Sequence, residues 1–400
     1  MSDANLSSLG PEDRLLLCCA RTAIDRETPN RMDAILRGGI DWAAFLDRIA
    51  HHRVSPLVLR SLRGLPAGIV PQDFLQSLTR RCNAIAARNL FLTAELIRIT
   101  GWLDSEGIDA IPYKGPTTAL LAYGNIALRE FGDLDILVRP RDYRKVRELF
   151  LARGYRLSAD WGWECSLTDD RRSLTVDVHV GLAPAQFPIA LDFDGLWDRR
   201  EFLPIAGGKI CTVGAADMLA VLCIQLIKDA WGESAARLSK VCDIAELLRA
   251  RPEIDLNRFA EIMRRIGCRR MLSVSLAAAH ELLGAASGAM GLVLLVRSAN
   301  PRLVDHVISR VFEDARNDHA AKLSRGRFHF EVRERWRDKV YPWYWDLKQR
   351  LPPNELDYAV VALPERFAFL YWFIRPVRIA RDLARTVFRA VRSRCSALIR

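Results

Sequence analysis

The 400-residue sequence lacks any apolar run of the roughly 18 residues that a membrane-spanning helix needs. The nearest approach is Phe367 to Ile374, so no transmembrane segment is expected. The opening residues, MSDANLSSLGPEDR, have no basic start followed by an apolar run, so no secretory signal is expected either. The sequence therefore predicts a cytoplasmic protein. No internal repeat and no low-complexity segment is found.

Cysteine is present but has no metal-binding or disulfide pattern. The nine cysteines are scattered, with one adjacent pair at Cys18 and Cys19, and no C-x-x-C spacing occurs. Neither a zinc site nor a disulfide framework is indicated. The cysteines are expected to be buried thiols in a reducing compartment.

The composition is that of a folded protein with an excess of positive charge. Half of the residues are hydrophobic and 27% are charged, and the length allows two or three domains. The formal net charge of +11 predicts anionic partners. Nucleotides, nucleic acids and lipid headgroups all satisfy that prediction, and charge alone does not choose among them.

Apolar residues recur at helical spacing from Pro11 to about Leu65, and again over a long amphipathic stretch from Phe74 to Leu103. After this stretch, short strand candidates alternate with helices, and two pairs of strands flank turn-like sequences, which indicates a mixed sheet. The expected strands are 108–113, 133–138, 164–167, 174–180, 201–205 and 209–213, and the expected helices between them are 116–123 and 142–153.

From Ala215 onward almost no strand pattern remains, and helices are separated by turn residues. The sequence thus predicts an α+β fold in which a mixed sheet with flanking helices precedes a mostly helical C-terminal half. Four regions are expected, namely an N-terminal helical region, an α/β core, a second helical region and a C-terminal helical region with a basic tail, at residues 1–73, 74–214, 215–290 and 291–400.

The informative chemistry begins with two aspartates on one expected strand. Side chains alternate between the faces of a strand, so Asp133 and Asp135 project from one side while Leu134, Ile136 and Val138 pack into the other. Two carboxylates that share a small space are costly unless a cation neutralises them. A hard divalent cation prefers such oxygen ligands, and magnesium is the natural candidate, with manganese as the alternative.

A later strand repeats the pattern. It sets Asp177 and His179 on one face and valines on the other. If this strand lies beside the first, Asp177 completes a carboxylate triad with Asp133 and Asp135. Three carboxylates can hold two metal ions, one that activates an acceptor hydroxyl and one that binds a triphosphate, which suits in-line transfer at phosphorus.

A candidate phosphate loop precedes the first aspartates. Gly115 ends a strand where a helix begins, so its backbone can approach a phosphate near the positive N-terminus of that helix. Pro116 fits the first helical position. Lys114 and Arg129 are the nearest fixed positive charges and are expected to hold phosphate oxygens, Arg129 with two donors.

Plain structural explanations compete with each of these assignments. A D-x-D on a strand is common by chance, and a lone histidine such as His179 is more often a hydrogen-bonded core residue than a ligand. Lys114 is alternatively a solvated lysine, and Arg129 alternatively pairs with Glu130 or Asp133. A second D-x-D at 192–194 reads as a loop or a helix start and is left out of the site.

These motifs resemble the uncharacterised nucleotidyltransferase family of bacteria, a branch of the DNA polymerase beta-like superfamily. The residues that carry the likeness are Lys114-Gly115, Arg129, Asp133-Leu134-Asp135 and Asp177-Val178-His179, and similar stretches at 41–54, 88–90, 228–243 and 363–376 extend it over most of the chain. Two positions depart from the pattern. Pro116 stands where the superfamily usually has serine, with Thr117 as the replacement hydroxyl, and Val180 stands where an aromatic residue often follows.

The resemblance implies a magnesium-dependent nucleotidyltransferase that moves a nucleoside monophosphate from a nucleoside triphosphate to an unknown hydroxyl-type acceptor and releases pyrophosphate. It implies that Asp133, Asp135 and Asp177 are the catalytic metal ligands. The nucleotide-binding residues would be Lys114, Gly115, Thr117, Arg129, His179 and Lys228. The acceptor would be a small molecule, a peptide or a protein. Two alternatives stay open: a catalytically degenerate nucleotide- or partner-binding protein of the same fold, and a phosphoryl transferase.

By the same resemblance, residues 215 to 284 would form a companion domain that closes over the nucleotide. Lys228, Arg237 and Asp243 fall on its expected helices and would face the cleft, although an exposed helix face with ordinary salt bridges explains them equally well.

The last 26 residues form a basic tail. Residues 375–400 contain eight arginines and one aspartate, with apolar residues at near-helical spacing. A basic amphipathic helix of this kind either lies on an anionic membrane surface as a peripheral contact or docks on its own domain, and docking is the preferred interpretation. No specific nucleic-acid binding is predicted, because no stacking-rich strand motif or recognition-helix pattern accompanies the charge.

Overall fold

A computed structural model provides the structure of this chain. It describes residues 9–183, 187, 189, 192–232, 236–284, 290–312, 319–350, 365–371, 373–378 and 381. Contacts divide the chain into two compact units, Met1–Lys339 and Val340–Arg400. The sheet and the candidate site described below both belong to the first unit.

Four short helices open the chain: α2 (Pro11–Cys19), α3 (Thr28–Arg37), α4 (Trp42–His52) and α5 (Ser55–Arg63). Asp41 caps α4, because its side chain accepts hydrogen bonds from the backbone N–H groups of Ala43 and Ala44, both at 3.0 Å. The helices predicted from Pro11 to about Leu65 are confirmed. The long amphipathic stretch is α6 (Gln72–Ser105), a single helix of 34 residues.

The sheet has five strands in the order β1-β2-β5-β4-β3. Strands β2 and β5 are parallel, and every other neighbouring pair is antiparallel, so the predicted mixed sheet is confirmed. A separate antiparallel pair, β6 and β7, forms the second predicted hairpin. The strand bounds are β1 Ala110–Pro112, β2 Leu134–Val138, β3 Arg156–Asp160, β4 Glu164–Asp169, β5 Leu174–His179, β6 Glu201–Ile205 and β7 Gly208–Thr212.

Strand β3 was not predicted. Its sequence, RLSAD, alternates but has only two apolar residues, and its side chains are mostly exposed at the edge of the sheet. Pairing with β4 makes it a strand, with a register shift between Leu157 and Ala159. Short helices connect the strands: α7 (Pro116–Tyr123), the 3₁₀ turn η1 (Ile126–Leu128), α8 (Tyr143–Ala152) and α9 (Phe193–Asp198). Helix α9 starts after Asp192, which caps it, so the second D-x-D is a helix start.

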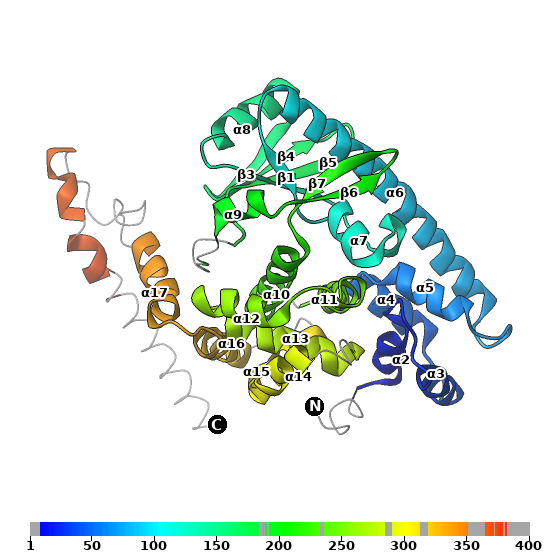
Figure 1. Cartoon of the computed structure of the whole chain (residues 1–400). Coiled ribbons are helices and arrows are strands. Elements are labelled where there is room, and N and C mark those ends of the chain that lie inside the picture. The colour runs from blue at the N-terminus through cyan, green and yellow to red at the C-terminus, as the bar shows by residue number, and fades with distance from the viewer. Residues whose placement is uncertain are drawn as a thin grey trace, which may run out of the picture. The chain divides into compact units, whose positions relative to one another are not determined.

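The two faces of the sheet have different environments. On one face, apolar residues of β2 and β5 such as Ile136 and Val178 join a buried cluster with residues of α6 and α8. The alternate positions, among them Asp135 and Asp177, turn to the other face. In Figure 1, helices α10 (Ala215–Trp231) and α11 (Leu238–Ala250) lie on that other side. The polar residues of the sheet therefore meet the helical part of the unit.

The remaining described elements are helical, as predicted. After β7, the described ranges contain no strand. Helix α11 packs against α7, α10 and α13, and so connects the helical half to the sheet. The helices that follow α11 are α12 (Leu256–Arg265), α13 (Arg269–Leu283), α14 (Met290–Arg297), α15 (Pro301–Phe312), α16 (His319–Val332) and α17 (Trp336–Arg350), and a 3₁₀ segment, η2 (Glu365–Leu370), lies in the second unit.

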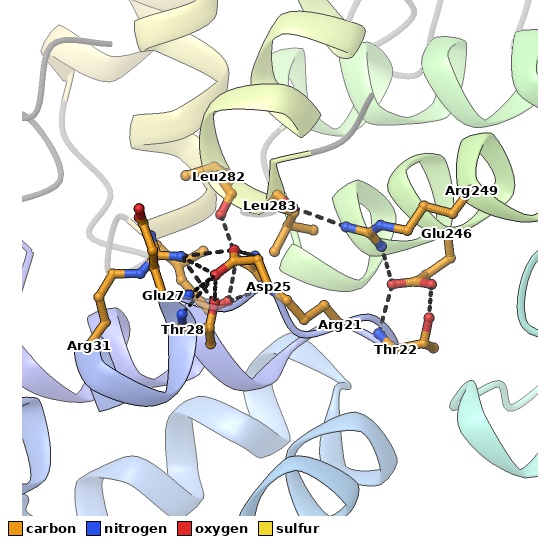
Figure 2. Close-up of polar contacts among 11 residues, drawn as sticks. Arg21, Thr22, Asp25, Glu27, Thr28, Arg31, Glu246, Arg249, Leu282 and Leu283 are labelled. Atoms are coloured by element: carbon orange, nitrogen blue, oxygen red, sulfur yellow. Dashed lines mark hydrogen bonds and ion pairs between the residues drawn. The ribbon is translucent and has the colours of Figure 1, made fainter. Parts of the chain in front are cut away.

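A buried polar cluster fastens the N-terminal helices to this helical half (Figure 2). The carboxylate of Glu246 on α11 is 1% exposed and accepts hydrogen bonds from the backbone and hydroxyl of Thr22 and from Arg249. Arg249 also donates to the carbonyl of Leu283 at the end of α13. The segment after α2 is therefore held by hydrogen bonds as well as by apolar packing.

Other predictions can be compared with the described residues. No helix among them is long and apolar enough to cross a membrane. The eight cysteines in the described ranges are all free, and six of them are buried. Most of the basic tail, residues 382–400, lies outside the described residues. The predicted docking of this tail, and the alternative contact with a membrane surface, therefore stay predictions. The four-part domain division stays a prediction.

Candidate active site

A cavity of about 340 Å³ lies between the polar face of the sheet and the helical half. Eight of the nine predicted site residues line it, and Thr117 is the exception. The cavity therefore brings together residues that are separated by more than one hundred positions in the sequence. Its lining comprises Arg53, Lys114, Gly115, Arg129, Glu130, Phe131, Asp133, Asp135, Trp163, Glu164, Asp177, His179, Gln225, Lys228, Asp229, Arg237, Ser239 and Lys240.

The three predicted acidic residues meet at neighbouring strands. Asp135 and Asp177 are register partners across the parallel pair β2 and β5, so their side chains start side by side on the same face. Asp133 precedes β2 and is exposed, whereas Asp135 is only 5% exposed. Parallel pairing thus supplies the arrangement that the triad requires.

Asp135 is the centre of a buried hydrogen-bond network. Its Oδ1 accepts from Lys114 Nζ at 2.5 Å and lies 3.0 Å from His179 Nε2. Burial acts to raise the pKa of Asp135, but the Lys114 ammonium and the His179 hydrogen bond outweigh it and hold that pKa below its usual range. The same carboxylate outweighs the burial of Lys114 and raises the pKa of the ammonium. Both groups are therefore charged at neutral pH.

His179 is a buried, hydrogen-bonded histidine that orients Asp135. Burial lowers its pKa to about 4, so the imidazole is neutral near pH 7. Its Nδ1 lies 3.3 Å from Glu164 Oε2. Burial and then the Asp177 charge raise the pKa of Glu164 to about 7. Because a neutral imidazole has one N–H, an Nε2–H directed to Asp135 leaves Nδ1 without a proton, close to Glu164 but with no hydrogen bond among the described residues.

Sequence reasoning missed Glu164. Its position was predicted as the start of a strand, but the pairing that places it opposite His179 in β5 was not considered. The available signal was the hairpin itself, since an acidic residue at the far end of one strand faces the D-x-H of the other.

Asp177 lacks a full counter-charge. Its Oδ1 accepts a hydrogen bond from Ser166 Oγ at 2.5 Å, but burial and the charges of Asp135 and Asp133 raise its pKa to about 6. A divalent cation would relieve that repulsion, and three carboxylates are the donors that such an ion prefers. The donor chemistry therefore fits a metal. Within the described part of the chain, no group of three or more His, Cys, Asp or Glu side chains has the spacing of a formed metal site.

The phosphate-loop glycine has a conformation that other residues avoid. Gly115 has φ of 53° and ψ of −122°, and a Cβ built on it would lie 3.3 Å from the carbonyl oxygen of Asp133. Pro116 begins α7, as predicted. Thr117 is fully buried, and its hydroxyl donates to the Lys114 carbonyl at 3.0 Å. Its hydroxyl thus closes the first turn of α7 rather than facing the cavity.

Arg129 is held by the helical half. Its Nε and Nη2 donate to the carboxylate of Asp243 on α11, each with a contact of 2.9 Å. Asp243 is fully buried and also accepts from Tyr123 at 2.9 Å. On the other side, the buried Asn89 of α6 donates to the Arg129 carbonyl at 2.8 Å. Arg129 therefore joins the sheet to the helical half, and the alternative explanation, pairing with Glu130 or Asp133, is not the contact observed.

The helical half and the end of α4 supply further cations to the cavity. Lys228 on α10 lines it and lies 3.3 Å from the carboxylate of Asp229. Arg237 and Lys240 at the start of α11 line it as well, together with Arg53. Neither Arg53 nor Lys240 was singled out from the sequence, because each lies in a region of ordinary helical pattern.

Residues 38–284 match the family model described as uncharacterised nucleotidyltransferase. The chain belongs to this uncharacterised nucleotidyltransferase family. The match covers more than half of the sequence and includes every predicted site residue. Membership confirms the prediction that the protein is a transferase of nucleotidyl groups.

Two solved structures are similar to parts of the chain. One is the lincosamide antibiotic adenylyltransferase LnuA with lincomycin bound, at 18% identity and a TM-score of 0.29, covering 38% of this chain and 94% of that one. The other is an antigenic nucleotidyltransferase-like protein from Paracoccidioides brasiliensis, at 16% identity and a TM-score of 0.31, covering 56% of this chain and 94% of that one. No curated protein matches the chain.

Proposed function

We propose that this nucleotidyltransferase moves a nucleoside monophosphate from a nucleoside triphosphate to an acceptor hydroxyl, with magnesium as the metal and pyrophosphate as the leaving product. The observation that carries the proposal is the register pairing of Asp135 with Asp177 on parallel strands, with Asp133 beside them in one cavity. The acceptor is a small molecule, a peptide or a protein.

Each carboxylate has its own role in the proposal. Asp133, Asp135 and Asp177 would hold the metal, and the Lys114 ammonium would move from Asp135 when the metal binds, because both compete for Oδ1. A divalent cation bound there supplies Lewis-acid activation of the acceptor hydroxyl and neutralises phosphate charge. Asp177, which lies beside Asp135 across the parallel pair, would take the acceptor proton.

The bonds balance as an in-line displacement. The acceptor oxygen forms a bond to the α-phosphorus, the bond from that phosphorus to the bridging oxygen breaks, and the electron pair leaves with pyrophosphate. Gly115 would let the backbone approach the phosphate. A side chain at this position would crowd the Asp133 carbonyl, so only glycine fits this turn without strain. His179 and Glu164 keep the Asp135 carboxylate oriented.

The test is pyrophosphate release by the full-length protein with ATP, GTP, CTP and UTP, with magnesium and with chelator, over a panel of hydroxyl acceptors. Asp135→Asn and Asp177→Asn are expected to lose at least a hundredfold in turnover. Asp170→Asn is the matched control, since this exposed aspartate lies in the turn between β4 and β5 and pairs only with Arg156 among the described residues. Full turnover in the two site variants, or release of a nucleoside diphosphate instead of pyrophosphate, would overturn the proposal.

A further inference from the structure

Two cations predicted to hold phosphate are already neutralised by the protein's own carboxylates. The ammonium of Lys114 contacts Asp135, and Arg129 makes two-donor contact with Asp243. Both carboxylates are buried, so these pairs are well shielded from water. Arg129 therefore offers no free positive charge to a triphosphate, and Lys114 offers one only after a metal has displaced it from Asp135.

Three other cations in the cavity have no such partner. Arg53, Arg237 and Lys240 line it, and their side chains form no hydrogen bond or ion pair with any residue that the structure describes. Burial and the charge of Arg53 lower the pKa of Arg237, and burial together with Lys114 and Arg129 lowers that of Lys240. The nearby acidic groups, Asp229 and Glu130, have cations of their own at Lys228 and Arg81. An anion would relieve this excess of positive charge.

The backbone holds these cations together. Arg53 ends α4 in the left-handed conformation, with φ of 55°, and Arg237 directly precedes the first residue of α11. The neighbouring His52 accepts a hydrogen bond from the backbone N–H of Leu238 through Nδ1 at 3.2 Å. This contact fastens the end of α4 to the first turn of α11, which also carries Lys240. The fold therefore fixes a basic wall, made of Arg53, Arg237 and Lys240, from two segments that are about 190 residues apart in sequence.

We propose that Arg53, Arg237 and Lys240 bind the β- and γ-phosphates of the nucleoside triphosphate, the part that leaves as pyrophosphate. The assignment rests on the proposed function and moves the main phosphate contacts from Lys114 and Arg129 to residues of the helical side. It requires the cavity to be shared, with the α-phosphate next to the carboxylates on β2 and β5 and the terminal phosphates next to the basic wall.

The test is calorimetric titration of ATP, AMP and inorganic tripolyphosphate into the full-length protein with magnesium present. Lys240→Gln, Arg237→Gln and Arg53→Gln are each expected to weaken ATP and tripolyphosphate binding about tenfold or more, because each removes a charge-assisted contact. AMP binding should change less than about twofold. Arg53 is exposed, so its variant is expected to fold normally. The controls are Lys209→Gln on β7 and Arg258→Gln on α12, both exposed and outside the cavity.

The sources of phosphate are separated by competition. Displacement of tripolyphosphate by ATP supports the assignment. Simultaneous binding of both would mean that the basic wall binds a phosphate group of the acceptor and not of the nucleotide, and would overturn the assignment. Unchanged affinities in all three variants, or no binding of tripolyphosphate to the wild type, would also overturn it. Failure of the proposed reaction gives a different result. In that case the three variants still bind ATP more weakly than the wild type, but the wild type releases no pyrophosphate. If the wild type releases pyrophosphate but the three variants bind ATP and tripolyphosphate as tightly as the wild type, only the assignment of the basic wall is overturned.

Discussion

Glu164 gives the most specific test of the buried network. Its carboxyl is expected to titrate with a pKa of about 7, compared with 4.5 for an ordinary glutamate. A carboxyl with a raised pKa binds its proton more tightly in the folded than in the unfolded protein. The free energy of unfolding therefore falls as the pH rises from about 4.5 through about 7 and is flat above that. Between these two pH values the free energy of unfolding falls by about 3 kcal/mol, because the folded protein then has to hold Glu164 in its ionised form.

Glu164→Gln removes the ionisation and keeps the size of a polar side chain beside His179. The variant is expected to be more stable than the wild type by about 1–3 kcal/mol at pH 8 and to differ by less than about 0.5 kcal/mol at pH 5. The assay is urea unfolding of both proteins at the two pH values, with chelator present so that no metal alters the carboxylates. Glu148→Gln on α8 is the matched control, because that carboxylate is 57% exposed and pairs with Arg144.

The comparison between pH values decides the outcome. An equal stability difference at pH 5 and pH 8 would mean that Glu164 does not change its ionisation between these values, and the raised pKa would be wrong. A destabilised variant at pH 8 would refute the reasoning more directly, since it would show that the charge contributes favourably where burial should penalise it.

Two further predictions concern the framework of the site. Gly115→Ala is expected to lower the free energy of unfolding by about 1–3 kcal/mol and to reduce turnover, because alanine disfavours φ of 53° and its Cβ crowds Asp133. Urea unfolding measures the change, with Gly101→Ala, at a helical glycine with open space around it, as the control. Equal effects of the two substitutions would contradict the prediction. Glu246→Ala is expected to lower the free energy of unfolding by about 2–4 kcal/mol, because Thr22 and Arg249 lose their buried acceptor. The same urea assay measures the change, with Glu253→Ala, at an exposed glutamate, as the control. A loss of less than about 0.5 kcal/mol would refute the structural role of the cluster.

The sequence by itself determined most elements and much of the cavity lining. Alternation along β2 and β5 separates polar from apolar positions, so the order of residues alone assigns Asp133, Asp135, Asp177 and His179 to one face. The start of α7 at Pro116 also followed from local chemistry. Local periodicity is enough for such predictions, because it depends only on neighbours along the chain.

Tertiary structure alone decided which groups neutralise one another. No local pattern indicates that Lys114 contacts Asp135 or that Arg129 pairs with Asp243 rather than with Glu130. Edge strand β3 was missed for a related reason, since its own apolar pattern is short and its pairing with β4 completes it. The basic wall likewise depends on His52 meeting the first turn of α11. Charge pairing and burial are properties of spatial neighbours, and these neighbours are brought together from distant parts of the sequence only when the chain folds.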